Sequence, residues 1–352
     1  MKIFMVHEDP WHAGNPYIYT LIEQIRKVHP ECEIAWGRER FWSQDIFSFD
    51  IVHFQWPQAF MAYDSHTEQM LLRHIEQMKA AGIRIVSTCH DLEPHYDQCA
   101  DKAESLKIVY SHCDAILHLG EYSLRLFKEQ YPTAAHLLLP HHLYDTIYHD
   151  FPSKATSLKH LRLRPDSTYI LCFGTFRADV ERQMVIDLYK QLNDKSIYIL
   201  APGFMDVWKL SWKILPRLYK KFYYKYKYHI YCTGKTWGAV SEADLPYYYG
   251  AADVAFIQRL KILNSGNALM PMLYGTVVVG PDCGNVGPLL RKWDYPVFQV
   301  DDTQRIGKVV SQGIQMGKDG FGRKNRAAQI EKYSTSHISD ELYSIYQNLL
   351  EA

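Results

Sequence analysis

The sequence predicts an α/β protein built from two doubly wound, Rossmann-like domains, each a parallel sheet with helices on both faces. Three observations lead to this class. The chain has 352 residues, more than one ordinary core holds. Short apolar runs alternate with longer segments of helical spacing. This alternation stops around residues 144–164, which are rich in His, Asp, Pro, Ser and Lys, and then restarts.

The first half of the chain contains the first set of alternating elements. The expected strands are 2–6, 33–36, 51–54, 83–88, 115–118 and 136–139. The expected helices are 16–28, 65–81, 101–112 and 122–130. Because each strand is followed by a helical crossover, neighbouring strands should run parallel. We therefore assign residues 1–150 to an N-terminal domain and residues 151–165 to a linker.

The second half repeats the pattern in a domain over residues 166–330. Its expected strands are 169–173, 196–200, 229–232, 254–257, 277–279 and 297–300, and its expected helices are 178–192, 243–251, 266–274 and 286–292. A last amphipathic helix is expected over 338–350, and we expect the segment 331–352 to pack back toward the N-terminal domain. Two such domains leave a cleft between them, and ligands of open α/β sheets bind beyond the carboxyl ends of the strands.

Composition excludes several classes of protein. The 39 Lys and Arg residues balance 39 Asp and Glu residues, which argues against a broad basic surface for nucleic acid. Seven scattered cysteines without a CxxC pair indicate reduced thiols. The start, MKIFMVHEDP, lacks the apolar run of a signal peptide, and no transmembrane helix is expected. We therefore expect a cytoplasmic protein. Without an Asp-x-Asp after a strand or a His/Cys grouping, we expect no catalytic metal.

The stretch LNSGNALMPMLYGTVVVGPDCGN, residues 263–285, places a small polar turn before an expected helix. A helix start offers unpaired N–H groups and the positive end of the helix dipole, and Gly266 lets a phosphate approach the backbone. The stretch can therefore be a diphosphate site. It can equally be an ordinary helix cap, since Ser265 and Asn267 are residue types that cap helices anyway.

Several motifs, taken together and in order, resemble GT-B glycosyltransferases of the glycosyltransferase family four type. The same stretch resembles the donor-site segment, DLPYYYGAADVAFI (244–257) the segment before it, and FGTFR (173–177) the loop that opens the second domain. NPYIYTLIEQI (15–25), DIVHFQWPQAF (50–60) and STCHDLEPHY (87–96) resemble the first domain of a bacterial branch that builds surface polysaccharides. The resemblance implies a GT-B fold with a nucleotide sugar in the interdomain cleft.

The resemblance also implies roles for donor-side residues. The backbone N–H groups of Gly266, Asn267 and Ala268 would meet the sugar-nucleotide diphosphate, and Arg177 would place its guanidinium against the same group. An arginine suits this task because it is always charged and binds phosphate in a bidentate manner. The alternative is that Arg177 only caps a surface loop.

The sequence departs from the family at three donor-side positions. Val180 stands near the place of a family lysine, and Arg182 could substitute as the second cation. Ile262 and Met270 occupy the places of two family glutamates, and neither side chain can ionise. Sugar recognition would then use other groups, and we name Asn264, Ser265 and Asn267 as candidates. These departures leave open whether the reaction retains or inverts the sugar's configuration.

Residues on the acceptor side follow strands of the first domain. His90 could bind the transferred sugar or move a proton, and Asp91 could orient it or act as the base for an acceptor hydroxyl. Glu93 is a second candidate base, although Asp91 can also simply start a turn. In the enzymes that the chain resembles, the loop holding Gly14 and Asn15 faces the acceptor. We place Gly14, Asn15 and Glu121 on this side, although Asn15 and Glu121 also suit helix starts.

The segment WKLSWKILPRLYKKFYYKYKYH, residues 208–229, interleaves cations with aromatic residues. Tyrosine and tryptophan favour the membrane interface, and lysine stems reach toward headgroups. We therefore expect a reversible contact with an anionic membrane surface. The alternatives are a helix with a solvated lysine face, or a site for single-stranded nucleic acid, which the rest of the chain does not favour.

The favoured function is a metal-independent transfer of a sugar, of hexosyltransferase type, from a UDP- or GDP-sugar to a carbohydrate or lipid-linked acceptor. It would serve surface or capsular polysaccharide synthesis at the inner face of the cytoplasmic membrane, without a cofactor. Two alternatives share the fold: a nucleotide-sugar 2-epimerase, against which the two missing glutamates argue, and a non-catalytic nucleotide-sugar-binding scaffold. A Rossmann dehydrogenase is disfavoured because no G-x-G-x-x-G follows the first strand.

Overall fold

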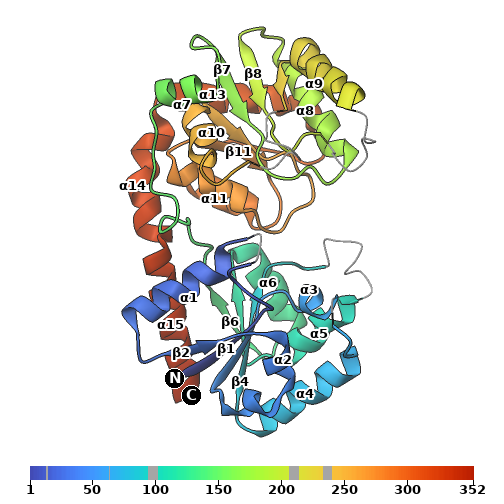
Figure 1. The fold of residues 1–352 in the computed structure, drawn as a ribbon, viewed down its shortest axis with the longest axis vertical. Helices are drawn as coiled ribbons and strands as arrows, with labels where there is room; N and C mark the ends of the chain where they lie inside the picture. Colours follow the sequence, from blue (N-terminus) through green and yellow to red (C-terminus); the bar gives the residue numbers. More distant parts are fainter. Residues whose placement is uncertain (13–14, 63, 94–101, 206–213, 233–239) are drawn as a thin grey trace. The chain divides into compact units, whose positions relative to one another are not determined.

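The computed structural model describes the chain apart from residues 13–14, 63, 94–101, 206–213 and 233–239. It divides into two compact units, residues 1–147 with 332–352, and residues 148–331. Each unit contains a six-stranded sheet with helices on both faces (Figure 1). Every strand pair in both sheets is parallel. The predicted class, two doubly wound α/β sheets, is confirmed.

The first unit has the strand order β2-β1-β3-β4-β5-β6. Its strands are β1 (Lys2–Val6), β2 (Glu33–Ala35), β3 (Ile51–Phe54), β4 (Arg84–Cys89), β5 (Ala115–His118) and β6 (Ala135–Leu138). Its helices are α1 (Tyr17–Val28), α2 (Arg38–Trp42), α3 (Pro57–Ala62), α4 (Glu68–Ala80), α5 (Ala103–His112), α6 (Glu121–Gln130) and α15 (Thr335–Glu351), with a 3-10 turn at Gln44–Ser48. All four residues of β3 are buried, as expected of a central parallel strand covered on both faces.

The C-terminal helix α15 packs against α1 in this unit (Figure 1). Its buried face includes Ile338, Leu342 and Tyr346, which recur at helical spacing. The Tyr346 hydroxyl reaches the centre of the sheet, where it lies 2.6 Å from Nδ1 of His53 on β3. The last helix therefore helps to fix the central strand from which the candidate site of this unit extends.

The second unit has the strand order β12-β11-β10-β7-β8-β9. Its strands are β7 (Thr168–Leu171), β8 (Ile197–Leu200), β9 (Ile230–Tyr231), β10 (Val254–Phe256), β11 (Val277–Pro281) and β12 (Val297–Phe298). Its helices are α7 (Lys154–His160), α8 (Asp179–Leu192), α9 (Ile214–Tyr228), α10 (Leu245–Ala251), α11 (Gly266–Leu273), α12 (Val286–Lys292), α13 (Ile306–Lys318) and α14 (Phe321–Tyr333), the last of which ends in the first unit, and a 3-10 turn spans Thr303–Arg305.

Five helices were not predicted from the sequence: α2 and α3 in the first unit, and α7, α13 and α14. A helix over α9 was only one of the alternatives for residues 208–229. α7 lies within the segment 151–165 that we read as a linker, and it packs against α10. α13 was missed because glycines at 307, 313 and 317 suggest a loop. In the structure two of these glycines allow close packing: a Cβ added to Gly313 would lie 2.4 Å from Val279, and one on Gly317 would lie 2.1 Å from the Asp253 carbonyl oxygen. α14 carries no clear apolar stripe.

Candidate functional site

In the second unit, the loop after β7 fits closely against the first turn of α11. The side-chain amide of Asn267 donates a hydrogen bond of 2.8 Å to the Phe173 carbonyl oxygen. Gly174 has φ +94, and a Cβ added there would lie 2.7 Å from Asn267 Nδ2. Only glycine suits this position. Two segments about 90 residues apart in sequence, FGTFR and the start of α11, are thus brought together, as a shared diphosphate site requires.

The first turn of α11 carries no negative charge, and the side chain that precedes it does not cap the backbone amides at the start of the helix. Ser265 is the residue before the helix, its side chain makes no capping hydrogen bond, and no acidic residue lies in the first turn. Gly266 and Asn267 are half-buried, whereas Ala268 is buried and its N–H already donates to the Ser265 carbonyl oxygen at 3.0 Å. The amides at the start of a helix have no partner within the helix, so those of Gly266 and Asn267 suit an anion best.

The turn before α11 is held by the loop that follows β11. The Asn285 backbone N–H donates to the Leu263 carbonyl oxygen at 2.8 Å, and the Asn285 side-chain amide donates to Oδ1 of Asn264 at the same distance. Gly284 has φ +52, and a Cβ added there would lie 2.3 Å from the Ile262 carbonyl oxygen. Asn264 therefore positions the turn through its side-chain oxygen. Ile262 is buried and belongs to the packing of this region.

A largely buried ion pair, Arg259 with Glu181, holds the FGTFR loop in place. Arg259, which follows β10, lies with Nε 3.2 Å from Glu181 Oε1 and donates through Nη2 to the Thr175 carbonyl oxygen at 2.8 Å. Glu181 Oε2 accepts a 2.7 Å hydrogen bond from the Arg177 backbone N–H. Arg177 itself is an exposed residue. The pair therefore fixes the backbone that presents Arg177.

Arg182 is bound within the protein. Its Nε donates to the Phe204 carbonyl oxygen at 2.8 Å, its Nη2 to the Phe176 carbonyl oxygen at 3.2 Å, and its Nη1 lies 3.1 Å from Asp179. All three guanidinium nitrogens thus have protein partners. The side chain ties the FGTFR loop to the loop after β8, and a direct contact with a diphosphate stays a prediction.

In the first unit, aromatic and polar side chains gather where β3 and β4 end. The Trp56 and His90 rings stack with centroids 4.0 Å apart, and the Tyr17 ring meets His90 edge-on at 5.1 Å. His90 Nε2 donates to Gln55 Oε1 at 2.9 Å. Gln55 and Trp56 come directly after β3, and Arg259 comes three residues after β10. These three residues were not named as candidates from the sequence. They follow from the rule that sites lie beyond the carboxyl ends of strands, when it is applied to every expected strand.

Burial keeps the histidines of this cluster neutral. Burial, and secondarily the neighbouring His141 and His53, holds the pKa of His90 well below its usual value. Burial also lowers the pKa of His53 to about 3 and that of His141 to about 4. His90 is therefore a neutral imidazole whose Nε2 proton is directed at Gln55. It can hold a hydroxyl by hydrogen bonding, but it does not supply positive charge.

The other predicted residues of this unit have mixed surroundings. Asp91 is buried and accepts a 3.0 Å hydrogen bond from the Gln58 side-chain amide. Glu93 and Glu121 are exposed, and Glu121 is the first residue of α6. Asn15 Oδ1 accepts hydrogen bonds from the Tyr17 backbone N–H at 3.1 Å and from the Tyr144 hydroxyl at 3.0 Å. Gly14 lies outside the described residues.

The neutral histidines predict a pH-dependent stability. The pKa values of His53, His90, His141 and His142 are lowered from 6.5 in the folded chain, so between pH 4 and 6.5 the unfolded chain binds more protons. Their contribution is present above pH 6.5 and is lost as the pH falls, by up to about 1.4 kcal/mol per pH unit for each histidine. Urea unfolding at pH 7.5, 6.5 and 5.5 measures this slope. A stability independent of pH over this range would contradict the prediction.

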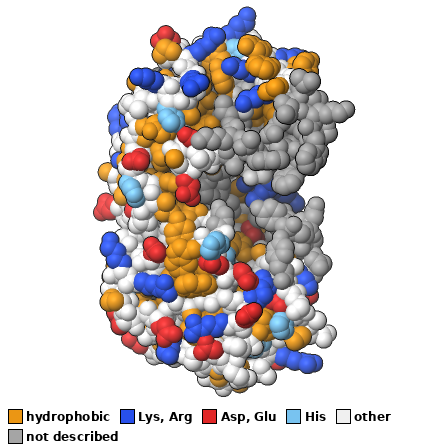
Figure 2. All heavy atoms as spheres, viewed as in Figure 1, with side chains coloured by type: hydrophobic (Ala, Val, Ile, Leu, Met, Phe, Trp, Pro, Cys, Tyr) orange, Lys and Arg blue, Asp and Glu red, His pale blue; other side chains and the backbone are white. Residues whose placement is uncertain are grey.

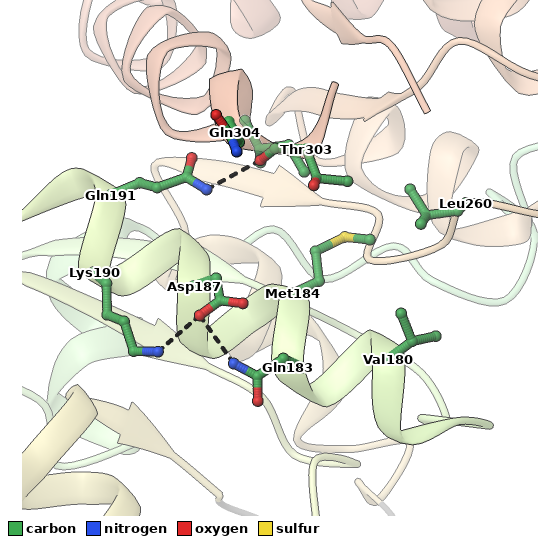
Figure 3. A pocket seen from close by; sticks show the side chains of 10 residues that line it. Val180, Gln183, Met184, Asp187, Lys190, Gln191, Leu260, Thr303 and Gln304 are labelled. Carbon is green, nitrogen blue, oxygen red and sulfur yellow. Dashed lines mark hydrogen bonds and ion pairs between the residues drawn. The ribbon is translucent and has the colours of Figure 1, made fainter. Parts of the chain in front are cut away.

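A separate pocket runs along α8 (Figure 3). Val180 and Leu260 lie at one end, and Gln191 lies at the other (Figure 3). Its polar groups already bind one another: Asp187 Oδ1 accepts from Lys190 at 2.8 Å and from Gln183 at 2.9 Å. This pocket therefore shows no cluster of groups directed at a ligand.

Two further observations concern metals and membranes. Among the residues that the structure describes, no group of three or more His, Cys, Asp or Glu side chains could hold a metal ion. Within the same residues, no helix combines the length and apolarity that a membrane span needs.

Comparison with known proteins gives structural likeness alone. No protein-family model matches the sequence, and no curated protein matches it either. Among solved structures, sucrose-phosphate synthase from Thermosynechococcus elongatus has a TM-score of 0.70 at 14% identity, covering 99% of each chain. HepE from Anabaena, in complex with UDP-glucose, has a TM-score of 0.68 at 11% identity, covering 99% of this chain and 100% of its own. A Listeria monocytogenes structure assigned as a UDP-N-acetylglucosamine 2-epimerase has a TM-score of 0.61 at 10% identity, covering 100% of this chain and 97% of its own.

These likenesses extend over the whole chain and concern both sheets. The solved structures include GT-B glycosyltransferases, and the predicted GT-B fold is confirmed. Because sequence identities are low, the likeness assigns the fold, and the activity has to be argued from the chain's own residues.

Proposed function

We propose that this chain is a glycosyltransferase that moves a sugar from a UDP- or GDP-sugar to a carbohydrate acceptor without a metal. One observation carries the proposal: the FGTFR loop and the first turn of α11 interlock through Gly174 and Asn267. This arrangement sets an arginine-bearing loop beside helix-start amides, the combination that binds a diphosphate. HepE, which shares the fold, has been solved with UDP and with UDP-glucose.

On the donor side, we propose that Arg177 and the amides of Gly266 and Asn267 bind the diphosphate. When the bond from the anomeric carbon to the diphosphate oxygen breaks, negative charge builds up on that oxygen, and these donors stabilise it. Arg182 and Asn264 hold the loops in place, and any contact of theirs, or of the Ala268 amide, with the donor would require rearrangement of the bonds described above. Ser265 and Asn267 are the candidates for sugar hydroxyls.

On the acceptor side, we propose that His90 binds a sugar hydroxyl as a neutral imidazole. A new bond forms between the anomeric carbon and the acceptor oxygen, and the acceptor proton must leave. Asp91 or Glu93 takes it if the reaction inverts, and the leaving phosphate takes it if the reaction retains configuration. Asn15 and Glu121, with Gly14, are proposed to lie near the acceptor.

The finer assignment rests on the sequence motifs. Segments 15–25, 50–60 and 87–96 resemble the first domain of family four enzymes from the bacterial surface-polysaccharide branch. We therefore propose a hexosyl donor, a lipid-linked acceptor in surface or capsular polysaccharide synthesis, and a place at the inner face of the cytoplasmic membrane.

Two other functions would use the same donor site. The Listeria structure favours a 2-epimerase as the second candidate. A non-catalytic scaffold is the third, because Ile262 and Met270 are buried apolar residues where family enzymes carry glutamates. Products separate the three: a transferase releases UDP only when an acceptor is present, an epimerase interconverts two UDP-sugars without release, and a scaffold does neither.

The test uses isothermal titration of UDP, GDP and CDP into the wild type, Gly174→Ala and Gly82→Ala. Both glycines have positive φ, +94 and +83, but a Cβ on Gly82 meets nothing within 4 Å. Backbone strain is therefore matched, and only Gly174→Ala displaces Asn267. We expect one nucleotide to bind the wild type and Gly82→Ala, and to bind Gly174→Ala at least tenfold more weakly. Equal affinity in all three proteins, or no binding by any of them, would overturn the proposed site.

A further inference from the structure

Helix α9 exposes a stripe of mainly aromatic side chains on one of its faces. Thirteen large hydrophobic residues are exposed among those described, and five of them lie within residues 218–226 of this one helix. They are Leu218, Tyr219, Phe222, Tyr223 and Tyr226, with exposures of 45%, 70%, 51%, 37% and 73%. Spacings of three and four residues place them on a single face. These residues therefore form one continuous apolar patch, whereas the other exposed large hydrophobic residues occur singly along the sequence.

The opposite face of α9 attaches the helix to the second unit. The Tyr224 ring packs edge-on against Phe204 at 4.9 Å, and the Tyr228 ring against Tyr189 at 6.3 Å. With 3.6 residues per turn, these two positions lie about 180° around the helix from the middle of the stripe. The stripe is therefore not needed to anchor the helix within its own unit.

The exposed rings are also ordered among themselves. Tyr219 stacks on Tyr223 at 6.4 Å, and Phe222 stacks on Tyr226 at 6.1 Å, each one turn apart. Lys227 lies 5.0 Å above the Tyr223 ring and donates a 2.8 Å hydrogen bond to its hydroxyl. These contacts hold amphipathic side chains along the outer edge of the helix, where one end of each can be in contact with lipid and the other with water.

Charge singles out the same surface. Residues 218–228 of α9 contain four lysines and no acidic residue, in a chain whose net charge is zero. On α9, cations border the stripe on both sides: Lys221 and Lys225 on one, Lys220 and Lys227 on the other. Figure 2 shows basic and hydrophobic side chains together at the outer surface where α9 lies in Figure 1.

We propose that this face of α9 binds the surface of an anionic lipid bilayer. Tyrosine and phenylalanine would enter the boundary between headgroups and acyl chains, and the bordering lysines would reach back to anionic headgroups. A second copy of the chain fits poorly, because two such faces would oppose cations with cations. Single-stranded nucleic acid is disfavoured because the exposed rings already stack on one another. The proposal does not depend on the sugar-transfer activity.

The test is co-sedimentation of the full chain with vesicles of phosphatidylcholine alone, or with 30% phosphatidylglycerol added. We expect at least tenfold tighter binding to the anionic vesicles, weakened by 0.5 M salt. Tyr219→Ser, Phe222→Ser and Tyr226→Ser together should reduce that binding at least tenfold. The matched control replaces Val28, Met70 and Leu138, three exposed apolar residues outside α9, with serine and should bind as the wild type does.

Three outcomes would overturn the proposal. One is equal binding of both variants to anionic vesicles. Another is tighter binding of a single-stranded oligonucleotide than of vesicles, lost in the α9 variant, which would assign the face to nucleic acid. The third is a dimer that the α9 variant loses while vesicle binding stays unchanged, which would assign it to self-association. Circular dichroism and the unfolding midpoint of each variant show whether it is folded, and Lys220→Gln with Lys227→Gln gives a milder second variant that should also weaken binding.

Discussion

Replacing Arg177 with alanine is expected to lower kcat/KM by about 10²–10³-fold, because one preorganised donor to the departing diphosphate is lost. Affinity for UDP or GDP should fall by about 10–100-fold, as expected when a charge-assisted hydrogen bond is removed. Release of the nucleotide from a UDP- or GDP-sugar in the presence of a carbohydrate acceptor, together with calorimetric titration of the nucleotide, measures both effects. Arg177 is an exposed residue, so we expect its replacement to change the free energy of unfolding little.

The matched control is Arg305→Ala. Arg305 is also exposed in the second unit and lies 3.1 Å from Asp302, so the net charge changes equally. Arg177→Lys should restore part of the affinity but less of the turnover, because lysine keeps the charge without the bidentate geometry. If Arg177→Ala and Arg305→Ala bind the nucleotide equally well, Arg177 is not part of the site.

Replacing Arg259 with alanine is expected to lower the free energy of unfolding of the second unit by about 3–5 kcal/mol, since it leaves Glu181 buried without its cation. The side chains of Arg259 and Glu181 are only 12% and 10% exposed. The Thr175 carbonyl oxygen also loses its donor, so the FGTFR loop should loosen and nucleotide binding should weaken. Urea unfolding followed by a probe of the second unit measures the stability.

A double variant separates the pair from the packing around it. Replacing Glu181 with Leu and Arg259 with Met together removes both charges and keeps most of the volume, and it should recover much of the lost stability. It should not recover nucleotide binding, because Glu181 also accepts the Arg177 backbone N–H. A loss below about 1 kcal/mol in Arg259→Ala would show that the pair is solvent-screened and has no supporting role.

The sheets could be predicted because their strands are buried on both faces. β1, β3 and β5 begin and end where the apolar runs 2–6, 51–54 and 115–118 do. A parallel strand with helices above and below has no solvent side to interrupt its apolar run. α13 was missed for the opposite reason. The positions of α13 that face the sheet include glycines, because β10 and β11 lie too close to the helix for a side chain. In a single sequence, glycines are typical of loops, so the helix was not expected.

The candidate site could be predicted only in part. The positions after β7 and before α11 follow from the rule that sites lie at the carboxyl ends of strands, and the structure brings them together. The partners of each polar side chain do not follow from that rule. Arg182 looks like a ligand cation in the sequence, yet it binds backbone carbonyl oxygens, and Arg259 pairs with a glutamate 78 residues away. Such pairings depend on tertiary contacts that no local pattern encodes.

Hydrogen–deuterium exchange of the intact chain, with and without saturating nucleotide, tests the central claim most directly. The claim is that a nucleoside diphosphate binds where the loop 173–177 meets the first turn of α11. It predicts that amides of 174–178 and 265–268 exchange at least tenfold more slowly with UDP or GDP bound, and that α4, in the other unit, exchanges as before. Nucleotide binding that leaves both segments unprotected would contradict it.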